Sequence, residues 1–167
     1  MTTHYYKIDD KNTDFCTKFL ELDADFYCIR QIVCKNERLI NSSIEVEGEF
    51  FLPEGSFEAF LPFFTQKISQ NDFEKLWERS KKPYLSAWNA LKQSASVGSE
   101  ANGRIVCFYP QGIVLDMGQS FYGIADYQAC KAIFGMENLY PNTILPLKIS
   151  GFDQTHFWVQ LSAEFYS

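Results

Sequence analysis

The chain has 167 residues, of which 46% are hydrophobic and 17% aromatic, so it can bury the core of one domain or of two small ones. Its 15 Lys and Arg residues are outnumbered by 21 Asp and Glu residues, which gives a net charge of −6 and a pI near 4.9. This composition excludes a largely disordered chain, and the charge would repel nucleic acid and attract a basic partner. The N-terminal residues form no charged or apolar leader, and no apolar run reaches the roughly 18 residues of a membrane span, so we expect a cytoplasmic protein.

The cysteines are widely spaced, include no Cys-x-x-Cys pair, and are accompanied by only two histidines. A zinc site or a disulfide framework has little to build on, and no motif indicates another cofactor. We therefore expect buried thiols in a reducing compartment and no bound metal. The five cysteines are Cys16, Cys28, Cys34, Cys107 and Cys130.

The N-terminal part of the chain predicts a β-hairpin followed by helices. Residues 1–25 are mixed and polar, and their apolar spacing fits a short helix and a strand equally well. Residues 26–34 are β-branched and aromatic, residues 35–38 are typical of a turn, and residues 39–52 continue in an extended pattern. This order favours two paired strands.

Three glutamates recur at every second position in the second arm of this hairpin, at Glu45, Glu47 and Glu49. On a strand they would point to one face. Residues 39–66 contain five acidic residues and no Lys or Arg, so the segment carries −5. Such a stripe is typical of a solvated face that protects a sheet edge, and it also fits a docking surface for a basic partner. A metal site lacks its remaining ligands.

Two helices are predicted next. Asn71 has the residue type of an N-cap, with Glu74 at the capping-box position, and Pro83 can open a second helix. The apolar spacing places Trp77 and Trp88 on the buried sides of these helices. We expect both tryptophans to be core residues rather than ligand platforms.

A run of small and polar residues follows and divides the chain. We place an N-terminal α+β region at residues 1–92, a linker at 93–102 and a second domain at 103–167. In the second domain, five short strands with a helical excursion at residues 127–140 predict a small closed barrel of the OB type. The fold class is therefore α+β, with a hairpin and helices followed by a five-stranded barrel.

The second domain contains a series of short glycine-containing and apolar motifs. They are Gly103-x-Ile105, Gly112, Val-Leu-x-Met-Gly at 114–118, Tyr-Gly-Ile-Ala at 122–125, Phe-Asp at 152–153 and Val-Gln-Leu-Ser at 159–162. In this order the motifs resemble the S1 RNA-binding domain over about sixty residues, little more than a third of the chain. The N-terminal region resembles no family that we can name.

The resemblance implies single-stranded RNA bound on one barrel face, where aromatic rings stack on bases and basic groups meet phosphates. The family's two stacking aromatics in the second strand fall on Gln111 and Val114, and its histidine in the third strand falls on Asp126. A basic residue of the last strand falls on Trp158, and residues 163–164 are Ala-Glu where basic residues often follow. The scaffold is thus kept while its RNA-binding residues are replaced.

Residues 105–167 contain five acidic and two basic residues, a net charge of −3, so counterion release cannot supply RNA affinity. The chain also has no nucleotide-binding, metalloprotease or nucleophile-elbow motif, and we predict that it is not an enzyme.

We expect a protein-binding module that holds a basic partner, in its most concrete form an inhibitor or immunity protein for a basic toxin such as a nuclease. The alternative is an S1-like RNA-binding protein of translation or RNA processing, acting through Tyr109, Tyr122 and Trp158. The residues predicted to contact the partner are Glu45, Glu47, Glu49, Tyr109, Tyr122, Asp126 and Trp158.

Overall fold

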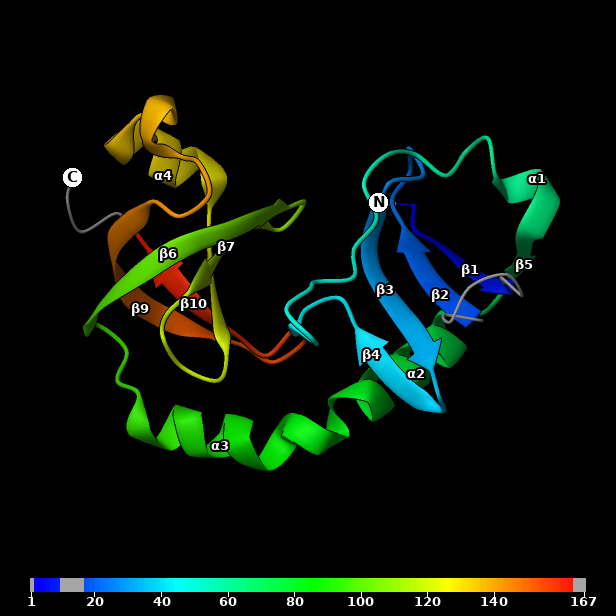
Figure 1. The fold of residues 1–167 in the computed structure, drawn as a ribbon, viewed down its shortest axis with the longest axis horizontal. Coiled ribbons are helices and arrows are strands. Elements are labelled where there is room, and N and C mark those ends of the chain that lie inside the picture. Colours follow the sequence, from blue (N-terminus) through cyan, green and yellow to red (C-terminus); the bar gives the residue numbers. More distant parts are fainter. Residues whose placement is uncertain (1, 10–16, 164–167) are drawn as a thin grey trace. The chain divides into compact units, whose positions relative to one another are not determined.

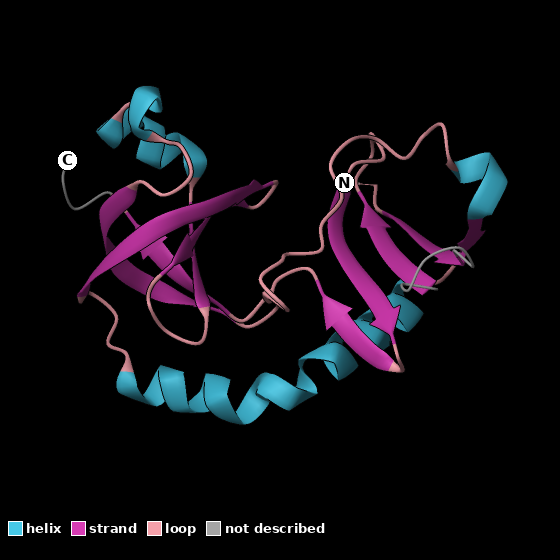
Figure 2. Cartoon of the chain, viewed as in Figure 1, coloured by secondary structure: helices cyan, strands magenta, loops and turns pink. Residues whose placement is uncertain are grey.

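The computed structural model describes residues 2–9 and 17–163 and forms two compact units, residues 1–84 and 85–167 (Figures 1 and 2). The elements of the first unit are β1 (His4–Asp9), β2 (Thr17–Leu22), β3 (Cys28–Lys35), β4 (Arg38–Asn41), α1 (Leu61–Phe64), β5 (Thr65–Lys67), α2 (Gln70–Lys81) and the 3₁₀ turn η1 (Lys82–Tyr84).

The first unit is a five-stranded antiparallel sheet in the order β4-β3-β2-β1-β5. The predicted hairpin is confirmed as β3 and β4. For residues 1–25 the sequence fitted a helix and a strand equally well, and the described residues form the strands β1 and β2. Helix α2 covers one face of the sheet (Figure 1). On this face Phe73 and Trp77 pack against Ile32. On the other face, Leu20 and Leu22 pack against half-buried residues that include Leu52 and Phe57. Both faces of the sheet are therefore covered.

The sequence predicted an extended strand at residues 39–52, but the strand ends at Asn41, so this prediction is wrong beyond that residue. The Asn41 side chain accepts hydrogen bonds from the Ser43 backbone N–H (3.1 Å) and hydroxyl (2.6 Å), which turns the chain as β4 ends. Val46 then exchanges two backbone hydrogen bonds with Glu49, and the residues between them, Glu47 and Gly48, have φ of 55° and 82°. This is a tight turn of the primed type.

The predicted acidic stripe therefore does not form. Glu45, Glu47 and Glu49 lie before, within and after the turn, so the period of two that would align them on a strand is lost. Glu47 is exposed and pairs with Lys35 at 3.2 Å, while Glu45 is half-buried. The reason is local, because Gly48 accepts a positive φ and favours a turn over an extended chain.

The helix predicted to begin at Asn71 is confirmed as α2, but its N-cap is Ser69 rather than Asn71. The Ser69 hydroxyl oxygen accepts a hydrogen bond from the Asp72 backbone N–H at 3.0 Å and donates to the Asp72 carboxylate at 2.7 Å. Ser69 thus caps the helix, and its hydroxyl also bonds to the Asp72 carboxylate, whereas the sequence predicted a capping box of Asn71 and Glu74.

The second unit is a closed five-stranded barrel, which confirms the predicted barrel and the α+β class. Its neighbour order, β10-β8-β7-β6-β9, is closed by the β9–β10 pair, with β8 and β10 parallel. A helix between the third and fourth strands completes an OB-like arrangement. The elements are α3 (Leu85–Ser94), β6 (Glu100–Tyr109), β7 (Gly112–Asp116), β8 (Tyr122–Ala125), α4 (Tyr127–Phe134), the 3₁₀ turn η2 (Met136–Asn138), β9 (Ile144–Asp153) and β10 (Trp158–Ser162).

Helix α3 belongs to the same unit as the barrel. Its Trp88 is fully buried, stacks on Phe157 with ring centroids 5.1 Å apart, and meets Phe121 and Phe152 edge-on. The Trp88 indole N–H donates a 2.7 Å hydrogen bond to Gln154 Oε1. Trp88 is therefore a core residue, as predicted.

The division of the chain differs from the predicted one. The units divide at residue 84 rather than 92, because Trp88 joins α3 to the barrel. The predicted linker at 93–102 is also too long. Helix α3 continues to Ser94, and residues 100–102 are already paired with β9 as the start of β6.

Candidate binding site on the barrel

Strand register defines an outer face over β6, β7, β8 and β10. Val114 is the register partner of both Cys107 and Ile124, so these side chains share one face, and alternation along β6 adds Tyr109. Val159 lies beside Gly123, which places Trp158 on the side of Tyr122. The outer face is therefore formed by Cys107, Tyr109, Val114, Tyr122, Ile124 and Trp158, and it is the surface that OB folds commonly use for ligands.

Aromatic rings on this face pack against one another. The rings of Tyr109 and Trp158 have centroids 5.9 Å apart, and His156 stacks on Trp158 at 4.4 Å and 9°. Trp158 is only 1% exposed, and Val114 is fully buried. Trp158, predicted as a surface anchor, is therefore a packed residue in this structure, because its ring is enclosed by its own neighbours.

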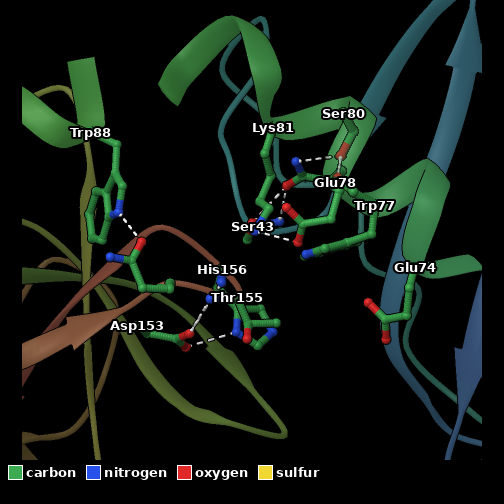
Figure 3. A network of polar contacts seen from close by, with 12 residues as sticks. Ser43, Glu74, Trp77, Glu78, Ser80, Lys81, Trp88, Asp153, Thr155 and His156 are labelled. Carbon is green, nitrogen blue, oxygen red and sulfur yellow. Dashed lines mark hydrogen bonds and ion pairs between the residues drawn. The ribbon is translucent and has the colours of Figure 1, made fainter. Parts of the chain in front are cut away.

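Asp153 fixes the ring that stacks on Trp158. Its carboxylate lies 2.8 Å from His156 Nδ1 and accepts backbone hydrogen bonds from Thr155 and His156 (Figure 3). Burial alone would raise the pKa of Asp153, but the hydrogen bonds and the charge of His156 outweigh it and hold that pKa below its ordinary value. The turn between β9 and β10 thus keeps the imidazole in place.

The one arginine of the barrel is paired. Arg104 lies 2.8 Å from Asp116 and also donates to Asn142 Oδ1 at 3.0 Å. The backbone N–H of Gly118, together with Arg104, holds the pKa of Asp116 below its ordinary range. Residues 85–167 contain six acidic and four basic residues, a net charge of −2. This is a poor field for a phosphate backbone.

A pocket of about 580 Å³ opens beside the outer face, where the β6–β7 turn meets the start of α4. We name it the barrel pocket. Phe108 and Tyr127 form an edge-to-face pair in its wall, with centroids 6.1 Å apart and an angle of 78°, and Phe108 is 41% exposed. None of the described lining residues is Lys or Arg. Its lining residues are Phe108, Tyr109, Pro110, Gln111, Gly112, Asp126, Tyr127, Gln128 and Leu139.

Of the described residues that line the barrel pocket, only Asp126 is charged. It is exposed and serves as the N-cap of α4, where its Oδ1 accepts a 2.7 Å hydrogen bond from the Ala129 backbone N–H. Within residues 2–9 and 17–163, no donor bonds to its Oδ2. One oxygen thus holds the carboxylate in place, and the other can accept a hydrogen bond from a ligand.

The structure brings together only some of the predicted site residues. Tyr109 and Asp126 both line the barrel pocket, and Tyr122 lies half-buried on the outer face. Trp158 is packed beneath that face, and the three glutamates belong to the other unit.

Sequence reasoning missed Phe108, Tyr127 and His156. The sequence did contain local signals for two of them. Phe108 precedes the predicted β6–β7 turn, and Tyr127 follows Asp126, which can cap a helix. His156 had no comparable signal, since its role depends on a ring two positions later in the chain.

No protein-family model matches this chain, and no curated protein matches it. Among solved structures, the chain is similar to a multidomain protein with nucleic acid binding domains from Streptococcus pneumoniae TIGR4. The TM-score is 0.29 with 9% sequence identity, over 96% of this chain and 50% of that one, so this chain spans half of its length. Because that TM-score is low, we base the function on this chain's own residues. No helix in the described part of the chain is long and apolar enough to cross a membrane.

Proposed function

We propose that this protein is a non-catalytic binding module that holds a basic segment of a partner protein in the barrel pocket. One observation carries the proposal: the described wall of the pocket has three aromatic rings and a fixed carboxylate, and none of its described residues is a cation. Aromatic residues with a few placed polar groups are typical of protein-binding sites, and the negative charge favours a basic partner.

The same features disfavour single-stranded RNA as the main ligand. RNA binding needs exposed rings for stacking and cations for the phosphates. On the outer face, Trp158 is packed and Arg104 is paired with Asp116. The barrel scaffold alone does not assign a function.

RNA is nevertheless the second candidate, because one observation favours it. The OB-like order of the barrel places Tyr109 and Tyr122 on the outer face, and both are partly exposed. A ring on this face can stack on a base, for about 1–3 kcal/mol per base. The RNA hypothesis therefore depends on Tyr109 and Tyr122, whereas the protein hypothesis depends on the barrel pocket, whose wall includes Tyr109 but not Tyr122.

The narrower prediction of an inhibitor or immunity protein stays a prediction, since no described feature distinguishes a toxin from another basic protein. The same holds for Glu45, Glu47 and Glu49 as a docking surface. Changing all three to Gln tests them, because capture of a basic partner should then weaken if they contribute.

A paired titration separates the two candidates. Fluorescence anisotropy would follow a labelled peptide of alternating Arg, Lys and Leu, and in parallel a labelled oligouridylate, each at low and high salt. We expect the peptide to bind, with affinity lowered by Phe108→Ala and Asp126→Asn. Asn still caps helices, so the second change removes charge without removing the cap.

Two matched variants serve as controls for this titration. Tyr140→Ala removes an exposed ring outside the pocket, and Glu100→Gln removes an exposed charge elsewhere on the barrel. Micromolar oligouridylate binding that is lost in Tyr109→Ala and Tyr122→Ala would overturn the proposal in favour of RNA. If the peptide binds equally well to Phe108→Ala and Asp126→Asn, the barrel pocket is not its binding site.

A further inference from the structure

We infer that the partner residue held in the barrel pocket is an arginine, whose guanidinium lies against the aromatic wall and pairs with Asp126. This inference rests on the proposed function and specifies its ligand. It follows from the ring geometry, the placement of the carboxylate and the helix that the carboxylate caps.

The first step is the aromatic wall. Phe108 and Tyr127 meet at 78°, so the edge of one ring meets the other and the two do not cover each other face to face. Phe108 keeps 41% of its surface exposed. The face of an aromatic ring attracts cations, and guanidinium groups occupy such positions more often than ammonium groups.

The second step is the position of the charge. Asp126 Oδ1 is held at 2.7 Å by the Ala129 N–H, which leaves Oδ2 as the acceptor within the described pocket. Asp126 and Tyr127 are adjacent, at the cap and first residue of α4. A cation that lies on the ring of Tyr127 can therefore reach the carboxylate as well.

The third step decides between arginine and lysine. The N-terminus of α4 carries partial positive charge, which offsets part of the carboxylate's attraction for any cation. Ring stacking must then supply more of the binding energy. Arginine stacks as a plane, is less strongly hydrated than lysine and can donate two parallel hydrogen bonds, so its gain at such a site is larger. A pocket of about 580 Å³ accommodates the whole side chain.

The inference can be tested by NMR titration of the full chain with three blocked amino acids. The probes are the N-acetyl methylamides of arginine, lysine and citrulline, the last being a neutral analogue of arginine with nearly the same shape. We expect saturable shifts of the backbone amides of Gln111 and Tyr127 with arginine. Lysine should bind about fivefold more weakly, because it stacks less well. Citrulline should cause no saturable shift at these amides.

Variants locate the interaction. Phe108→Leu should abolish the preference for arginine over lysine, whereas Tyr140→Leu, an exposed ring outside the pocket, should preserve it. Asp126→Asn should weaken arginine binding by about threefold at low salt, as expected for an exposed ion pair, and Glu100→Gln should not.

The outcomes distinguish this inference from the proposed function. Lysine binding as tightly as arginine, or citrulline binding equally well, would overturn the assignment to arginine while the pocket remained a site for peptides. Arginine shifts that map away from the pocket would overturn it too. The proposed function fails separately, if the basic peptide does not bind and the oligouridylate does.

Discussion

At the scale of single residues, the best-defined polar cluster lies in the first unit around Arg30. Arg30 is 6% exposed and pairs with both Glu21 and Glu74, and its guanidinium lies 5.1 Å from the ring centroid of Phe73 and 4.9 Å from that of Trp77. Burial would lower the pKa of Arg30, but the two carboxylates outweigh this effect and raise it. The ion pairs of Arg30 therefore link the sheet to α2.

We predict that Arg30→Ala lowers the free energy of unfolding of the first unit by about 3 kcal/mol, because it leaves Glu21 buried without its cation. Urea unfolding followed by the NMR signals of β2 and β3 measures this change. Arg38→Ala is the control, since Arg38 is exposed and makes a 3.0 Å hydrogen bond to the Tyr84 hydroxyl, and it should cost less than about 1 kcal/mol. Equal effects of the two changes would show that the buried cluster contributes no special stability.

Asp153 gives a prediction about pH. Its pKa is held below the ordinary value in the folded chain, so as the pH falls the unfolded chain takes up the proton first. The stabilisation is therefore present above pH 5 and is lost as the pH falls toward the lowered pKa. At pH 6 Asp153→Asn should be less stable by about 1 kcal/mol, since Asn keeps the backbone acceptor but loses the charge. That difference should shrink toward pH 3 in unfolding measurements, and a constant difference would contradict the linkage.

At the scale of elements, the β6–β7 turn positions the barrel pocket. Gly112 has φ of 142°, and a Cβ placed there would overlap the carbonyl oxygen of Ala125 on β8. Gly98, in the same unit, also has a positive φ (91°) but has open space around it. A side chain at Gly98 would therefore meet backbone strain alone, whereas a side chain at Gly112 would meet both strain and steric overlap.

We predict that Gly112→Ala destabilises the second unit by about 2 kcal/mol more than Gly98→Ala does, because β7 must move away from β8 to admit the methyl group. Urea unfolding followed by the NMR signals of β7 and β8 measures both variants. If the two changes cost the same, positive φ alone would explain the requirement for glycine.

Local patterns predicted these elements well where the signal lay in neighbouring residues. Alternation and turns located the hairpin and the barrel strands, and helical spacing buried Trp77 and Trp88. The pattern at Glu45, Glu47 and Glu49 failed, because a period of two means a shared face only in an extended chain and Gly48 allows a turn.

Contacts between distant residues could not be read from the sequence. Glu74 was predicted at a capping-box position, yet it pairs with Arg30 across 44 positions. Trp158 looked like a surface anchor because the S1 resemblance placed it at a ligand position, yet its ring is covered by Tyr109 and His156. The candidate site was therefore predicted only in part, through Tyr109 and Asp126.

At the scale of the whole molecule, the two units have different sources of stability. The first depends on a sheet covered on both faces, and the second on a closed barrel whose core includes a residue of α3. Composition located a boundary at the polar run after residue 92, but Trp88 binds the preceding helix to the barrel. A run of polar residues shows where the chain is exposed, but it does not show where the hydrophobic core of a domain begins.

This difference predicts how fragments of the chain behave. A fragment of residues 85–167 keeps Trp88 with Phe121, Phe157 and Gln154 and should unfold cooperatively in urea, with the dispersed NMR spectrum of a folded barrel. A fragment of residues 93–167 lacks that indole, and loss of a buried tryptophan costs about 3–5 kcal/mol, a large part of the stability of a domain this small. It should therefore be largely unfolded. The control is the fragment of residues 85–167 with Trp88→Ala, which contains helix α3 but lacks the indole ring. It should be as unstable as the fragment of residues 93–167. If residues 93–167 fold as stably as residues 85–167, then α3 is a linker and the boundary drawn from composition is the physical one.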